Sequence, residues 1–63
     1  MMLADSHIRV GDWMLGKYKK TPQWFECVVM GQGEDGKWIV EWADGDPQDT
    51  LKEGKHLKKM HRL

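Results

Sequence analysis

The sequence predicts a single small all-β domain, built as a barrel of five short strands. Three observations lead to this prediction: the chain has only 63 residues, turn signals recur at short spacing, and no stretch shows helical periodicity. A chain of this length buries a small core and is only marginally stable. The four Trp, the five Met and the β-branched residues are therefore expected to supply that core.

Three clusters of turn-forming residues, at 19–22, 31–36 and 43–47, separate runs of strand-forming residues. Asp35-Gly36 in the second cluster is a strong hairpin signal, because both residues tolerate the positive φ that a tight turn requires. The runs predict strands at 10–18, 23–30, 37–42, 48–52 and 57–60. Residues 53–56 are expected to form one 3₁₀ turn, since Gly54 disfavours a longer helix. Five short strands with a 3₁₀ turn before the last correspond to the plan of an SH3-like barrel.

Alternation along the strands sorts the side chains into two faces, and both faces carry apolar residues. The face that bears Gly16 and Cys27 is expected to point inward, because small residues suit a tight barrel interior. Trp38 shares the parity of its strand's inward residues and is expected in the core. Trp13 and Trp24 have the opposite parity, so they either pack on each other or stay partly exposed.

Three aromatic residues of the inward-facing set lie beside loops at one predicted rim of the barrel. Tyr18 closes the first strand, Phe25 opens the second and Trp42 closes the third. Asp44 and Asp46 follow Trp42 in the next loop. Aromatic faces attract a methylated ammonium, whose methyl groups are weakly hydrated, and a carboxylate balances its charge. These five residues are the candidate ligand-binding site; the alternative is that the three rings only cap a small core.

The motifs VGDWMLGKY, WFECVV and WIVEWADGD resemble a Tudor domain. Such domains tend to show a Gly-Asp opening, a small residue two positions before the first cage aromatic, a second aromatic about seven residues later, and an aromatic-x-Asp-Gly segment at the end of the third strand. The resemblance implies an aromatic cage that reads methylated lysine or arginine in a basic peptide such as a histone tail. Its lining would be Tyr18, Phe25, Trp42 and Asp44. Asp46 stands where many members carry a further aromatic, which implies a more open and more acidic cage.

Charge is balanced over the whole chain but is unevenly distributed along it. Residues 31–50 carry six acids and one base, whereas residues 51–63 carry five bases and one acid. The middle segment can therefore attract a cation, and the last segment an anion such as a phosphate backbone.

Two alternative functions remain open from the sequence. The chain could be a nucleic-acid-binding small barrel, which would use the lysines after the first strand and the basic residues near the end: Lys17, Lys19, Lys20, Lys58, Lys59 and Arg62. It could also be a homo-oligomeric assembly module that binds no ligand and uses its Trp-rich surface.

We predict no enzymatic activity, no cofactor and no metal. Cys27 lies in the middle of a strand, where a buried structural thiol is the usual case. Asp44 and Asp46 have no acid–base partner, and rim aspartates beside a turn usually stabilise the turn. The three His residues are scattered, without the spacing of a zinc site.

The sequence contains no apolar run long enough to cross a membrane, and its first ten residues lack the features of a signal peptide. The single thiol fits a reducing environment. We therefore expect an intracellular protein without a membrane partner, and the Tudor resemblance implies the nucleus. The predicted division is an N-terminal extension at 1–9, a Tudor-like barrel at 10–60 and a C-terminal tail at 61–63.

Overall fold

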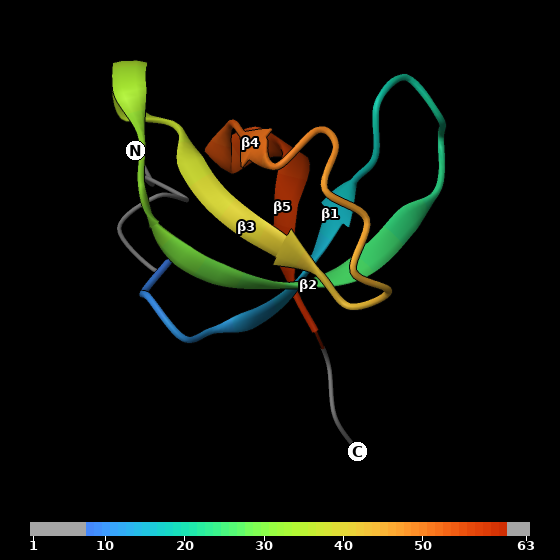
Figure 1. Ribbon diagram of the computed structural model, residues 1–63, viewed down its shortest axis with the longest axis horizontal. Coiled ribbons are helices and arrows are strands. Elements are labelled where there is room, and N and C mark those ends of the chain that lie inside the picture. The colour runs from blue at the N-terminus through green and yellow to red at the C-terminus, as the bar shows by residue number, and fades with distance from the viewer. Residues whose placement is uncertain (1–7, 61–63) are drawn as a thin grey trace.

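A computed structural model describes residues 8–60, which form one antiparallel sheet curled into a half-barrel (Figure 1). Its strands are β1 (Trp13–Lys17), β2 (Trp24–Gln32), β3 (Trp38–Trp42), β4 (Leu51–Lys52) and β5 (Leu57–Lys59), in the order β4-β3-β2-β1-β5. Two 3₁₀ turns, η2 (Glu34–Gly36) and η3 (Gly54–His56), complete the fold. The predicted all-β class, the five strands and the 3₁₀ turn before the last strand are confirmed. Residues 1–7 and the predicted tail at 61–63 lie outside the described residues.

The strands β3 and β5 are each one residue shorter than predicted, and β1 and β4 are shorter by several residues because local turns replace their ends. Before β1, the backbone N–H of Asp12 donates to the carbonyl of Arg9 at 3.0 Å, and the Arg9 N–H donates to the Asp12 carboxylate. Because of this turn, β1 begins at Trp13 and not at residue 10. Before β4, Asp49 adopts a left-handed φ of 54°, which no strand accommodates. The predicted strand at 48–52 is therefore reduced to Leu51–Lys52.

The strand β2 is longer than predicted and contains an irregularity. Its register against β3 shifts between Val29 and Gly31, which is the signature of a β-bulge. Figure 1 shows β2 as a long, strongly curved strand, and it lies between β3 and β1 in the sheet. At its end Asp35 (φ 59°) and Gly36 (φ 73°) are both left-handed, so the predicted Asp-Gly turn does connect β2 to β3.

The inner face of the curled sheet carries the core, and the predicted orientation is confirmed. Gly16, Cys27 and Trp38 are all buried there. The buried apolar residues are Ile8, Met14, Cys27, Val29, Trp38, Val40, Trp42 and Leu57. Ile8 belongs to this core although it precedes the predicted barrel boundary at residue 10. Burial raises the pKa of the Cys27 thiol to about 11, which makes it an inert structural thiol at neutral pH.

The outer face of the sheet carries the tryptophans of opposite parity. Trp13 is 48% exposed and Trp24 is half-buried. In the β1–β2 ladder Trp13 is opposite Val28, and Trp24 is opposite Lys17. The two indoles therefore occupy opposite ends of the same ladder and stay partly exposed, one of the two arrangements that the sequence left open.

We predict that Gly45→Val destabilises the domain through backbone strain alone. Gly45 has a φ of +83°, and its N–H donates to the Trp42 carbonyl at 2.9 Å, which closes the turn after β3. An added Cβ would meet no atom within 4 Å, so steric clash is not involved. A left-handed β-branched residue costs about 1–2 kcal/mol. This loss should lower the Tm by roughly 4–8 °C per kcal/mol, as measured by circular dichroism.

The matched control is Gly45→Asn, because asparagine tolerates the left-handed region much better than valine. Its Tm should lie close to that of the native chain. Equal Tm values for Gly45→Val and the native chain would contradict the strained turn.

Candidate ligand-binding site

Three aromatic rings come into contact at one end of the sheet. Tyr18 follows β1 directly, Phe25 is opposite Gly16 near the start of β2, and Trp42 ends β3. The Tyr18 ring centroid lies 6.1 Å from that of Phe25 and 5.3 Å from that of Trp42. The interplanar angles are 82° and 80°, so Tyr18 meets both neighbours edge to face.

The three rings differ strongly in exposure. Phe25 is 42% exposed, Tyr18 is half-buried, and Trp42 is only 3% exposed. Trp42 is thus a core residue in this conformation, covered by Tyr18 and packed near Gly16. The ring surface that a ligand can reach belongs to Phe25 and Tyr18.

Trp42 also ties the loop after β3 to the core. Its indole N–H donates to the backbone carbonyls of Gln48 at 2.9 Å and of Asp49 at 3.1 Å. These two bonds hold the 43–50 segment across the end of the sheet. The acidic residues of this loop are therefore fixed beside the aromatic cluster.

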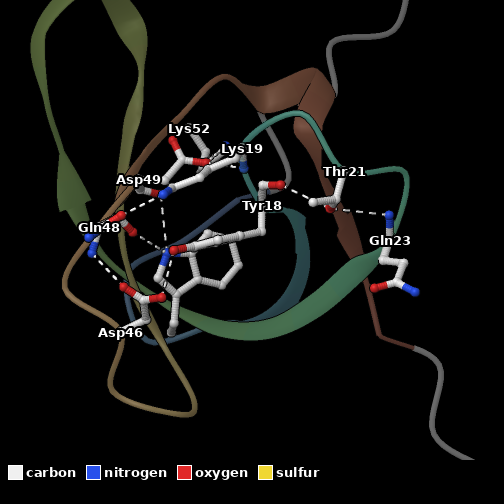
Figure 2. Close-up of polar contacts among 9 residues, drawn as sticks. Tyr18, Lys19, Thr21, Gln23, Asp46, Gln48, Asp49 and Lys52 are labelled. Atoms are coloured by element: carbon white, nitrogen blue, oxygen red, sulfur yellow. Dashed lines mark hydrogen bonds and ion pairs between the residues drawn. The ribbon is translucent and has the colours of Figure 1, made fainter.

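Asp46 contacts the aromatic cluster directly, whereas Asp44 contacts it through Asp46. The Tyr18 hydroxyl donates to Asp46 Oδ2 at 2.6 Å, and Asp46 Oδ1 accepts the Gln48 N–H at 2.9 Å. The exposed Asp44 accepts the Asp46 N–H at 3.0 Å, which is an Asx-type turn contact. Figure 2 shows Tyr18 and Asp46 facing each other, with Gln48 beside them.

The charge state of this pair is set by their mutual hydrogen bond. The bond to Asp46 is the main reason that the pKa of Tyr18 rises to about 12, with further contributions from burial and from the charges of Asp46, Asp44 and Asp49. The same bond, together with the Gln48 N–H, lowers the pKa of Asp46 below its usual value. At neutral pH Tyr18 is therefore protonated and Asp46 ionised, and Asp46 is the carboxylate in direct contact with the Tyr18 hydroxyl.

Two lysines that the sequence did not place at this site lie over the same rings; one of them, Lys19, was expected only as a nucleic-acid contact. Lys52 is only 6% exposed; its Nζ lies 6.0 Å from the Trp42 ring centroid and 2.7 Å from Asp49 Oδ2. The Nζ of Lys19 lies 5.4 Å from the Tyr18 ring centroid and donates to Gln48 Oε1. The protein's own ammonium groups thus use the ring faces that a cationic ligand would seek.

Asp49 is the anion that holds these lysines, and it too was missed. Its carboxylate accepts bonds from the Lys52 ammonium and from the Lys19 backbone N–H (Figure 2). Burial raises the pKa of Asp49, but the hydrogen bond from Lys52, the bond from the Lys19 N–H and both lysine charges outweigh it, so the pKa lies below its usual value. Lys52 is opposite the buried Trp38 in the β3–β4 ladder, so it has the parity of the inward-facing residues. This parity was the only sequence signal for its burial.

Among residues 8–60, no three His, Cys, Asp and Glu side chains gather as a metal site requires. The same part of the chain includes no helix that is long and apolar enough to cross a membrane. The fold and the site thus define a small all-β domain with an aromatic, acidic rim. No protein-family model, curated protein or solved structure matches the chain.

Proposed function

We propose that this chain is a non-enzymatic binding module with an SH3-like, Tudor-type barrel. Its ligand is a methylated lysine or arginine in a basic peptide such as a histone tail. With such a ligand, the protein would act inside the cell, in the nucleus. The observation that carries this proposal is the right-angled corner of Tyr18 and Phe25, whose centroids lie 6.1 Å apart beside an ionised Asp46. The strand order and the 3₁₀ turn before β5 support the barrel type.

The corner suits an alkylated ammonium for electrostatic and solvation reasons. Two ring walls each contribute about 0.5–2 kcal/mol to the binding of a cation, more as the cation loses water. The negative field of Asp44, Asp46 and Asp49, which already raises the pKa of Tyr18, adds attraction for any cation at the rim.

The covered position of Trp42 favours ligands that keep an N–H group. With Trp42 buried, the accessible rings are those of Phe25 and of Tyr18, over which the Lys19 ammonium lies, so a trimethylated ammonium would lack a complete aromatic enclosure. A mono- or dimethylated side chain can instead donate its remaining proton to a rim carboxylate, a charge-assisted hydrogen bond worth about 1.5–3 kcal/mol. We therefore expect the lower methylation states to bind more tightly.

The test is an NMR titration of the ¹⁵N-labelled protein with peptides that carry mono-, di- and trimethyl-lysine or dimethyl-arginine. Binding should shift the amide signals around Tyr18 and Phe25. Phe25→Ala should weaken the binding by roughly 2–30-fold, because it removes one cation–π wall. Phe25 is 42% exposed, so this variant should remain folded.

Leu51→Ala is the matched control, because Leu51 is equally exposed at 42% but lies in β4, away from the three rings. It should bind the peptides like the native chain. The proposal fails if no methylated peptide shifts these signals at millimolar concentration, or if Phe25→Ala binds as tightly as Leu51→Ala.

A further inference from the structure

A second aromatic cluster lies on the outer face of the sheet and is basic instead of acidic. The Nζ of Lys58 lies 4.3 Å from the Trp24 ring centroid, and the Nζ of Lys17 lies 5.7 Å from it. Lys17 is opposite Trp24 in the β1–β2 ladder, and Lys58 is opposite Leu15 in the β1–β5 ladder. The Trp24 indole is thus in contact with two ammonium groups, one from β1 and one from β5.

Some lysines of residues 8–60 form ion pairs, whereas Lys17 and Lys58 form none, like Lys19, Lys20 and Lys37. Lys52, Lys55 and Lys59 pair with Asp49, Glu53 and Asp12. Two like charges around one ring, neither of them ion-paired, leave a local positive potential that an anion would reduce.

The basic cluster is separate from the acidic rim. Trp24 and Phe25 are neighbours in β2, and their side chains point to opposite faces of the sheet. Lys17 and Lys58 share the outer face with Trp24, as their ring contacts show. The exposed Glu26 also has this parity; Glu26 and Lys58 are both opposite Leu15, so one carboxylate borders the basic cluster.

We infer that Trp24, Lys17 and Lys58 form a binding site for single-stranded nucleic acid. A half-buried indole with ammonium groups at its borders matches one nucleotide: the base stacks on the ring and the flanking phosphates meet the lysines. In the free protein the lysines cover the ring; their flexible stems let them move to the phosphates when a base arrives. A single strand is favoured over a duplex, because a duplex keeps its base faces stacked inside.

Fluorescence anisotropy with a labelled single strand of about 12 nucleotides, DNA or RNA, tests this inference. Two phosphate contacts predict a slope of log K against log salt of about −1.4, so a fourfold rise in salt should weaken binding about sevenfold. Lys17→Gln combined with Lys58→Gln should abolish most of this salt dependence. Trp24→Leu should weaken binding at least about fivefold while keeping the slope, and Trp24→Phe, which retains a stacking ring, should restore most of the affinity.

The matched control is Lys55→Gln combined with Lys59→Gln, which changes the net charge equally at lysines that already have partners. Lys59 was a nucleic-acid candidate from the sequence, but it pairs with Asp12 and is opposite Met14, so its parity is opposite to that of Lys58. It should bind like the native chain, and so should Phe25→Ala, which separates this site from the peptide site. Glu26→Gln should tighten binding by removing a nearby negative charge. The inference is overturned if the control pair weakens binding as much as the Lys17/Lys58 pair, if a duplex binds as tightly as the single strand, or if Trp24→Leu has no effect.

Discussion

Replacement of Trp42 by alanine is expected to unfold the domain, and not merely to remove a wall of the binding site. Trp42 is 3% exposed, covers the inner face near Gly16 and donates two hydrogen bonds to the carbonyls of the next loop. Deleting a buried Trp side chain costs about 3–5 kcal/mol. A chain of 63 residues has a total stability of only about 3–9 kcal/mol at ordinary values per residue.

Urea titration followed by circular dichroism and the dispersion of the ¹H–¹⁵N spectrum will measure this effect. Trp42→Ala should show collapsed dispersion or a midpoint shifted far toward zero urea. Phe25→Ala, which touches the same Tyr18 ring from an exposed position, should lose only about 0.5–1.5 kcal/mol. If Trp42→Ala and Phe25→Ala unfold at the same urea concentration, Trp42 is not the anchor that its burial indicates.

Gly16→Val is expected to destabilise the domain by about 1–3 kcal/mol or more through overpacking. A Cβ at position 16 would lie 3.1 Å from Leu57 Cδ2, 3.2 Å from Cys27 Sγ and 3.2 Å from Trp42 Cη2. The three neighbours come from three different strands and are all buried, so none can yield without displacing another part of the core. The added γ-carbons of valine increase the conflict.

Gly31→Val is the matched control for this substitution. Gly31 is also a strand glycine, at the bulge in β2, but an added Cβ would meet no atom within 4 Å. Its urea midpoint should remain close to the native value, while that of Gly16→Val falls. A native-like midpoint for Gly16→Val would show that the interior has free space that the packing distances do not indicate.

Local sequence signals were sufficient for the class of fold and for the orientation of the sheet. The spacing of the turns set the number of strands, and the small residues Gly16 and Cys27 identified the inner face, because Leu57, Cys27 and Trp42 leave no free space for a side chain at position 16. The strand ends were not predictable in the same way. They depend on single residues that leave the extended region, such as Asp49, and on hydrogen bonds such as that from Arg9 to Asp12.

The candidate site was predictable in its composition but not in its internal arrangement. Strand parity placed Tyr18, Phe25 and Trp42 at one end, and the structure brings their rings together. Parity does not report depth, however, so the burial of Trp42 beneath Tyr18 had no sequence signature. The pairing of Lys52 with Asp49 over the Trp42 ring was equally hidden, because it arises only when β4 returns beside β3.

The consecutive positions of Trp24 and Phe25 have a consequence for how two ligands would be held. One residue faces each side of a single-layered sheet, so a peptide at Phe25 and a nucleic acid strand at Trp24 would be separated by little more than the backbone of β2. Both ligands would bind to the same strand, β2, with no linker between Trp24 and Phe25. Where the two ligands belong to one assembly, binding of the first raises the effective concentration of the second, and the combined avidity exceeds either affinity alone.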